Sequence, residues 1–215
     1  MNFKTATLAG LAAMLMAGSA MAVDVKLGVL NDRSGIYADL SGEGSVVAAR
    51  MAIEDFDAAA KGINVEVISA DHQNKPDVAS TIARQWYDEE GVDVIVDVPT
   101  SSAALAVNEI TREKGKIFLN SGAASTDLTG AQCAPGTAHW TYDTYALANG
   151  TGKAMVDYGY QNWYFLTADY AFGHSLEENT TAVVQASGGT VVGSVRHPFP
   201  GTDFSSFLLQ AQASG

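Results

Sequence analysis

Positive charge is scarce in this sequence. It carries 12 lysine and arginine residues against 24 aspartate and glutamate residues, a formal net charge of −12. A nucleic-acid-binding protein normally presents a basic face, so the composition argues against nucleic acid as a partner. The apolar fraction of 47% provides for a sizeable buried core and excludes a disordered chain.

Long apolar runs are absent after the first 22 residues. No later segment approaches the roughly 20 consecutive apolar residues that cross a bilayer. The apolar run Leu8–Ala17 follows the positive Lys4 and precedes the small-x-small sequence Ala20–Ala22. These are the three parts of a secretory signal peptide, and the run is too short for a membrane anchor. We therefore expect residues 1–22 to be cleaved and the mature protein to be exported.

Cysteine is represented once, by Cys133. A single cysteine excludes an internal disulfide in this chain. Two interpretations stay open: a lightly buried thiol, or a thiol whose partner cysteine lies outside the given sequence.

Motifs for cofactors, metals and nucleophilic catalysis are missing as well. Gly42 and Gly44 lie well past the first expected strand, whereas a dinucleotide-binding loop follows its strand directly and continues to a third glycine, where Val47 stands. Neither a Gly-Lys-Ser/Thr sequence nor a Gly-x-Ser-x-Gly sequence occurs. The four histidines show no metal-ligand spacing, and His72 is expected to be solvated. We predict no catalytic residue, no metal and no cofactor.

Apolar periodicity predicts alternating strands and helices, which indicates βαβ units and a parallel sheet. Strands are expected at Val25–Leu30, Val65–Ser69, Val92–Val96, Ile117–Asn120, Trp163–Thr167 and Thr190–Val195. Helices are expected at Ser45–Ala59, from Pro76 to Tyr87, after a cap at Ser101 or Ser102, at Asp143–Tyr158, at Phe172–Ser187 and after Asp203. The intervening segment Ser121–Ala138 is expected to be a long polar loop.

The expected elements divide into two groups. Residues 23–138 supply four strands with the helices between them, enough for one α/β lobe, whereas residues 139–215 supply only two strands. We therefore predict a doubly wound α/β fold in two lobes, each with a parallel sheet. The second lobe is expected to be incomplete, which makes the sequence a fragment of a longer protein.

Polar residues follow each of the first four expected strands. Ligands of open parallel sheets bind beyond the carboxyl ends of the strands. The segment Pro99–Ser102 leads directly from a buried strand into a helix, where free N–H groups and serine hydroxyls suit a carboxylate. The alternative interpretation is plain helix capping by Ser102.

Several short segments occur in a characteristic order: Lys26–Leu30, Ser34–Gly35, Ala48–Ala52, Asp71, Ser101–Ser102, Asn120–Ala123, Asp127–Gly130, Tyr142–Gly152 and Thr167–Gly173. In this combination they resemble the substrate-binding proteins of ABC importers of the branched-chain amino acid class. The resemblance covers residues 23–215. It implies a periplasmic-binding-protein fold of two lobes that close on a small molecule, a monomer in the periplasm, and permease subunits of the inner membrane as partners.

The same resemblance implies a set of ligand-binding residues. Ser101 stands at the family's main serine position, whereas Ala124 lacks a hydroxyl that the family presents there, and Ser125 is its expected substitute. The family often has an aromatic residue at the place of Leu40, and Tyr37 is its expected replacement. Side chains of the second lobe are expected to cover an apolar ligand tail. The expected site residues are Ser101, Ser102, Gly122, Ala124, Ser125, Tyr37, Tyr170 and Phe172.

The function implied by the resemblance is capture of a branched-chain or related amino acid for import. The missing hydroxyl at Ala124 makes an aromatic carboxylate the alternative ligand. A sensory ligand-binding module of the same fold is a second hypothesis, which a downstream transmembrane or kinase segment would favour. An enzyme is a third, but no positioned nucleophile, base or cofactor loop supports it.

Overall fold

The computed structural model describes residues 22–214. The expected signal peptide, residues 1–22, lies outside the described residues except for its last one. Within residues 22–214, none of the helices combines the length and the apolar character that a membrane crossing requires.

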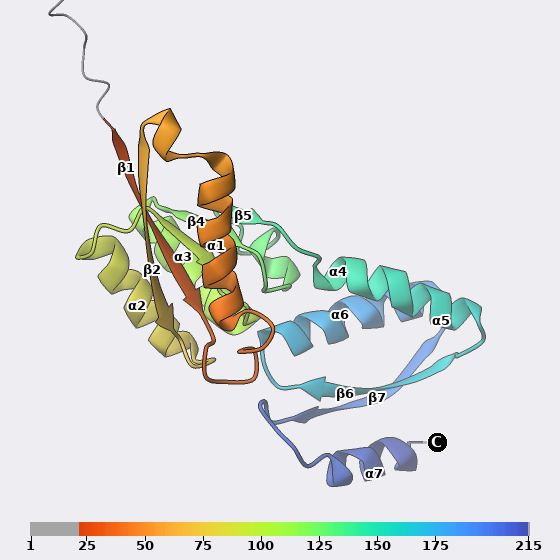
Figure 1. The fold of residues 1–215 in the computed structure, drawn as a ribbon. Helices are drawn as coiled ribbons and strands as arrows, with labels where there is room; N and C mark the ends of the chain where they lie inside the picture. The colour runs from red at the N-terminus through yellow and green to blue at the C-terminus, as the bar shows by residue number, and fades with distance from the viewer. Residues whose placement is uncertain (1–21, 215) are drawn as a thin grey trace, which may run out of the picture.

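Aliphatic strands build a five-stranded sheet in the first lobe (Figure 1). Its order is β2-β1-β3-β4-β5 and every neighbouring pair is parallel. Because the register aligns Leu30 with Asp97 and Asp97 with Asn120, the polar carboxyl ends of the strands meet at one edge of the sheet. The strands are β1 (Val23–Asn31), β2 (Ile63–Asp71), β3 (Val94–Asp97), β4 (Ile117–Asn120) and β5 (Thr137–His139).

The strand β5 corrects the sequence prediction, which placed a polar loop over Ser121–Ala138. The segment begins as a loop with the short 3-10 helix η2 (Thr126–Leu128) and then pairs with β4. A strand of three residues carries no readable alternation. Its place is set by backbone hydrogen bonds, such as Trp140 N–H to the Asn120 carbonyl at 2.8 Å.

Two helices, α2 (Pro76–Asp88) and α3 (Ser101–Lys114), pack together on one face of this sheet. Their apolar faces form the main core with Leu30, Ile95 and Phe118, all fully buried. Trp86 of α2 packs so close to β1 that a Cβ at Gly28 would lie 2.4 Å from its ring. Only a glycine allows this approach of helix to strand.

A single helix, α1 (Gly42–Phe56), packs on the opposite face, over β1 and β2. The 3-10 helix η1 (Ala59–Lys61) then leads into β2. The central strand β3 alternates between half-buried and buried residues, and β4 between exposed and buried ones. This face of the sheet is therefore covered only in part.

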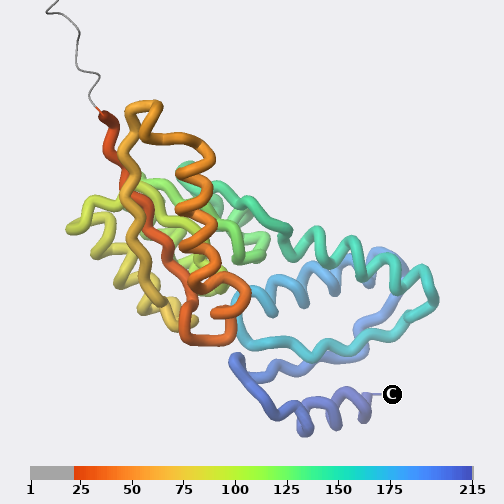
Figure 2. The backbone as a smooth tube through the Cα atoms, viewed as in Figure 1, coloured from red at the N-terminus to blue at the C-terminus, as the bar shows by residue number. Residues whose placement is uncertain are grey.

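The second lobe begins where the chain leaves β5. Figure 2 shows the backbone as it runs from the first lobe into the second. The expected helix Asp143–Tyr158 consists of three consecutive segments, with a π-helical stretch in the middle. Helices α6 and α7 lie on either side of a parallel pair of strands (Figure 1). The elements are α4 (Thr144–Leu147), η3 (Ala148–Gly152), α5 (Lys153–Asp157), β6 (Asn162–Ala168), α6 (Ala171–Ala186), β7 (Thr190–His197) and α7 (Ser205–Ala213).

The predicted fold class is confirmed. Both sheets are parallel, and α-helices separate consecutive strands from β1 to β4 and again between β6 and β7, as βαβ units require. Within the described residues, the second sheet holds two strands against five in the first.

Candidate ligand-binding site

A buried polar network organises the carboxyl edge of the first sheet. The Asp97 carboxylate accepts from Asn31 Nδ2 at 3.2 Å and from the Ser121 hydroxyl at 3.2 Å. Asn31 also donates to the Gly42 carbonyl at the start of α1, at 2.6 Å. Asp97 and the following Val98 both have positive φ angles, 78° and 58°. Such strained backbone persists where its surroundings hold it, and here it turns the chain from β3 toward α3.

The N-terminus of α3 corrects the capping prediction. Thr100 is the N-cap residue, and its side chain makes no capping hydrogen bond. Ser101 and Ser102 are therefore the first two helical residues and not caps. The first N–H groups of a helix have no intrahelical acceptor, so they and the Ser101 hydroxyl form a site suited to an anion.

The loop after β4 lies directly against this helix start. Ala124 N–H donates to Ser101 Oγ at 3.3 Å. A Cβ at Gly122 would lie 2.8 Å from Pro99 Cα, so glycine is required for the approach of the two loops. Ser125 is fully buried, and its hydroxyl accepts from Asp127 N–H as the cap of η2.

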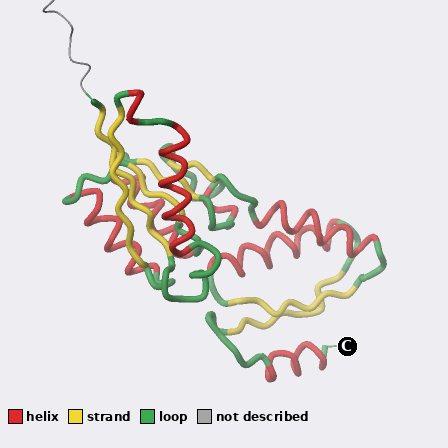
Figure 3. Tube along the Cα trace, in the orientation of Figure 1, coloured by secondary structure: helices red, strands yellow, loops and turns green. Residues whose placement is uncertain are grey.

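The loop after β1 brings Tyr37 to the same edge. The buried Asp32 carboxylate holds this loop, because it accepts from Gly35 N–H at 2.8 Å and from Tyr37 N–H at 3.0 Å. Figure 3 shows the loop, in green, on the side of the first lobe that faces the second.

The second lobe contributes Tyr170 and Phe172 from the start of α6. The Tyr170 hydroxyl lies 2.7 Å from that of Tyr37, across the two lobes. Burial is the main cause that raises the pKa of both phenols above the usual value. Both tyrosines are therefore neutral at physiological pH.

These segments enclose a small cavity of about 210 Å³. Six of the eight predicted site residues line it; Ser102 and Ser125 do not. The Ser102 hydroxyl instead accepts from Ala171 N–H of the second lobe, at 3.2 Å. The lining residues are Tyr37, Leu40, Pro99, Ser101, Gly122, Ala124, Tyr142, Tyr170 and Phe172.

Two aromatic residues at the site were not predicted. Tyr142 lines the cavity, and Phe199 stacks on the Tyr170 ring with centroids 4.3 Å apart and planes 9° from parallel. Tyr142 belongs to a segment that the resemblance had singled out, so its place after the crossing between lobes was a usable signal. Phe199 follows β7 without any motif, and only the tertiary structure brings it to Tyr170.

A hydroxyl cluster joins the lobes behind the cavity. Thr144 Oγ1 and Ser175 Oγ lie 2.6 Å apart, and Thr126 Oγ1 lies 3.1 Å from Ser175 Oγ. Thr144 N–H also donates to the Ala124 carbonyl at 2.9 Å. The cavity-lining loop is thus fixed to the helices of both lobes.

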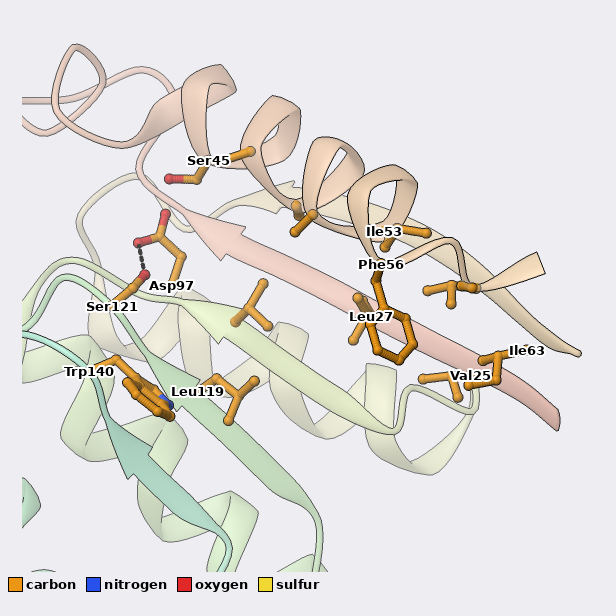
Figure 4. A pocket seen from close by; sticks show the side chains of 16 residues that line it. Val25, Leu27, Ser45, Ile53, Phe56, Ile63, Asp97, Leu119, Ser121 and Trp140 are labelled. Atoms are coloured by element: carbon orange, nitrogen blue, oxygen red, sulfur yellow. Dashed lines mark hydrogen bonds between the residues drawn. The ribbon is translucent and has the colours of Figure 1, made fainter. Parts of the chain in front are cut away.

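A second, larger hollow of about 550 Å³ lies outside this cavity, between α1 and the partly covered face of the first sheet (Figure 4). Its walls are mainly aliphatic, with Val25, Leu27 and Leu119 among them. Asp97 and Ser121 stand at one end, where they bond to each other. Parallel sheets normally bury both faces. We therefore interpret this groove as a part of the sheet face that α1 does not cover, and not as a ligand site.

Two further sequence expectations need correction. His72 is fully buried, not solvated, and burial lowers its pKa. Its Nδ1 accepts from Asn74 N–H at 3.0 Å, so the ring shapes the turn after β2. Cys133 is exposed, which contradicts the lightly buried thiol.

The chain belongs to the periplasmic binding protein family, whose model matches residues 24–215. This is a family of solute-binding proteins, not of enzymes. A curated relative, the Leu/Ile/Val-binding protein homolog 6 of Brucella abortus, is 25% identical over 99% of this chain and 54% of its own length. The chain thus spans about half the length of the curated relatives it matches.

Solved structures of similar proteins agree with this membership. A periplasmic binding protein from Burkholderia mallei is 52% identical, with a TM-score of 0.86 over 89% of this chain and 51% of that one. A branched-chain amino acid ABC transporter ligand-binding protein from Burkholderia xenovorans is 42% identical (TM-score 0.72, 88% and 51% covered). An ABC transporter solute-binding protein from R. palustris in complex with benzoate is 25% identical (TM-score 0.80, 88% and 52% covered).

Proposed function

We propose that this protein is the solute-binding component of an ABC importer and captures one small carboxylate-bearing molecule between its lobes. The observation that carries the proposal is the cavity itself, which combines the start of α3 with side chains from both lobes. A ligand held there contacts both lobes at once. Its binding therefore favours their closed arrangement.

The carboxylate is placed at the N-terminus of α3. The N–H groups of its first turn, the positive end of the helix dipole and the Ser101 hydroxyl stabilise a negative charge there. This local arrangement allows an acidic protein, with a net charge of −12, to bind an anion without a basic patch.

Two ligand classes are candidates. The names of the Brucella abortus and Burkholderia xenovorans relatives support a branched-chain or related amino acid. The benzoate complex of the R. palustris protein supports an aromatic carboxylate. The aromatic lining and the methyl group of Ala124, in place of a hydroxyl, favour the second class.

The wider setting follows from the same proposal. Residues 1–22 act as a cleaved signal peptide, residues 23–138 together with His139 of β5 form the first lobe, the residues after β5 belong to the second lobe, and the monomer works in the periplasm. Its macromolecular partners are the permease subunits of the inner membrane. A sensory module with the same fold remains the competing function, and a transmembrane or kinase segment in the same gene would favour it.

A thermal-shift experiment on the complete protein tests the proposal. Leucine, isoleucine, valine and benzoate form the panel, and leucinamide and benzamide serve as controls in which a neutral amide replaces the carboxylate. A ligand at 100 times its Kd adds about 2.7 kcal/mol of stability. We expect stabilisation by at least one carboxylate and not by its amide. Equal stabilisation by acid and amide would contradict the carboxylate site.

A further inference from the structure

Helix α6 of the second lobe takes a cap from the first lobe. Within the described residues, its own N-cap residue, Tyr170, makes no side-chain capping hydrogen bond. The first N–H groups of a helix have no acceptor inside the helix. The first of them, Ala171 N–H, donates instead to the Ser102 hydroxyl of α3, at 3.2 Å. One serine of the first lobe thus satisfies the start of a helix in the second.

The neighbouring hydroxyls at the start of α3 have different partners. Successive residues of an α-helix point about 100° apart around the helix axis. Ser101 lines the cavity and accepts from Ala124 N–H of its own lobe, whereas Ser102 turns to the second lobe. Ser102 therefore acts on a bound ligand through the position of the second lobe and not by contact.

A second bond between the lobes lies next to this one. The Tyr170 hydroxyl, one residue before Ala171, lies 2.7 Å from the Tyr37 hydroxyl of the first lobe. Both tyrosines line the cavity, so their removal would also change the contacts of a ligand. Ser102 is the position at which the bond between the lobes can be removed while the cavity lining stays intact.

Farther along α6, polar side chains are tied to the crossing between the lobes. Ser175 and Asn179 follow Ala171 at intervals of four residues, which places all three on one side of the helix. Ser175 Oγ lies 2.6 Å from Thr144 Oγ1, and Asn179 Nδ2 donates to the same oxygen at 3.2 Å. Thr144 begins α4, directly after the chain enters the second lobe. Asn179 is about 12 Å along the helix from Ala171. A motion about the crossing therefore displaces the start of α6 more than this cluster.

The bond from Ala171 to Ser102 is weak enough to be reversible. When the lobes separate, water replaces the Ser102 hydroxyl on this N–H group. The net gain of a neutral hydrogen bond over its hydrated state changes an equilibrium by a factor of about five. The apparent affinity for a ligand is proportional to the fraction of protein in the arrangement that binds it. A loss of this bond is thus expected to lower the affinity by the same factor.

We infer that Ser102 is a positioning residue for ligand capture: its hydroxyl holds the start of α6 when the lobes close, and it raises the affinity for a ligand that it does not touch. This inference rests on the proposed function. It requires an effect of equal size on every ligand of the cavity, because the bond belongs to the closed arrangement and not to any one ligand.

Calorimetric titration of the complete protein with leucine, isoleucine, valine and benzoate tests the size of the effect. Ser102→Ala is expected to weaken each of these probes that binds by about fivefold, and by the same factor for each. Ser102→Thr keeps a hydroxyl and is expected to restore most of the affinity. Ser80→Ala is the matched control, since the Ser80 hydroxyl donates to the Pro76 carbonyl of its own helix, α2, at 2.8 Å. It should leave every affinity unchanged.

Hydrogen exchange of the Ala171 amide, followed by NMR, separates this role from a merely structural one. We expect a saturating probe to slow exchange of this amide in the unmodified protein and in Ser102→Thr. In Ser102→Ala at saturation, the amide is expected to exchange faster than in Ser102→Thr, since its acceptor is gone. A general destabilisation of α3 would not produce this dependence on ligand at a single amide of α6.

Different results overturn different statements. An unchanged affinity in Ser102→Ala overturns the inference and leaves the proposed function standing. An Ala171 amide that is equally protected with and without a bound probe does the same, because the bond would then be permanent. Losses in Ser102→Ala that differ severalfold between probes would mean that Ser102 contacts the ligand itself. If none of the four probes binds, the proposed function fails and the inference fails with it.

Discussion

The two lobes differ in how completely they are packed. Helix α3 of the first lobe buries seven of its 14 residues, whereas α7 of the second lobe buries none. Among the largest fully buried side chains of residues 22–214, Val184 alone comes from the second lobe. Five strands support the first core and two the second. A sheet of two strands has marginal stability without further packing.

This difference bears on how the site works. The well-packed first lobe holds the groups to which we assign the carboxylate, at the start of α3 and in the loop after β4. The second lobe supplies the aromatic cover, Tyr170 and Phe172. The proposed anion site and its aromatic cover therefore come from different lobes.

The strongest test of the comparison is a matched pair of phenylalanines. Phe118 of β4 is fully buried, so Phe118→Ala is expected to lower the free energy of unfolding by about 3–5 kcal/mol. Phe165 of β6 is only half-buried and borders a hollow of about 520 Å³. Phe165→Ala should cost about half as much. Denaturant unfolding measures both values, and equal losses would mean that the lobes are equally well packed.

Hydrogen exchange tests the same contrast without a mutation. Amides of β1, β3 and β4 have neighbours on both sides or buried surroundings, whereas β6 and β7 each pair with one strand. We expect exchange in β6 and β7 of the expressed chain to be about a hundredfold faster, a difference of about 3 kcal/mol in opening free energy. Equal protection in the two sheets would remove the argument from packing.

Much of the fold was predictable because its strands are continuous apolar runs and its helices have apolar faces at helical spacing. The segment Trp163–Thr167 was placed correctly within β6 for this reason. The strand β5 was missed, since its three residues Thr137–His139 fit no period. The helix after Asp143 was expected to be regular, and its π-helical stretch coincides with the glycines of Ala148–Gly152.

The site was predictable where it follows from topology. Ser101, Gly122 and Tyr37 come together because the carboxyl ends of parallel strands share one edge. The orientation of individual hydroxyls was not predictable in this way. Ser125 turns to cap η2, and Phe199 reaches the site only through the path of the chain after β7.

Two serine substitutions test whether the ligand binds at the start of α3 or in the larger groove. Ser101→Ala is expected to weaken binding of leucine or benzoate, whichever of these two probes binds, by about 1.5–3 kcal/mol. This is the range for a hydrogen bond to a charged group. Ser45→Ala, near the start of α1 and lining the groove, should leave both affinities unchanged. Calorimetry on the complete protein measures the difference. A larger effect at Ser45 would move the ligand site to the groove.

A glycine pair tests the close approach of the site loops. Gly122→Ala forces a Cβ to within 2.8 Å of Pro99 Cα, so the loop must shift. Overpacking of this kind costs about 1–3 kcal/mol. The matched change Gly44→Ala places its Cβ in open space within α1 and should stabilise the protein by about 0.5–1 kcal/mol. Thermal unfolding of both variants checks the opposite signs, and a stabilised Gly122 variant would show that the loops have room.

The smallest effect concerns Tyr87 in the first core. Burial raises the pKa of Tyr87 to about 12, and its hydroxyl lies 3.1 Å from Thr111 Oγ1. Since the folded-state pKa lies above the unfolded value of 10, the folded protein holds the proton more tightly at high pH. The stabilising contribution is therefore complete below pH 10 and is lost as the pH rises toward 12. At pH 10.5 the loss is roughly 0.8 kcal/mol.

Tyr87→Phe should reduce the decline in stability between pH 9 and 10.5, whereas Tyr160→Phe, at an exposed position of the second lobe, should not. Unfolding at a series of pH values measures the slope, and an unchanged slope in Tyr87→Phe would show that this phenol ionises as freely in the folded core as in the unfolded chain.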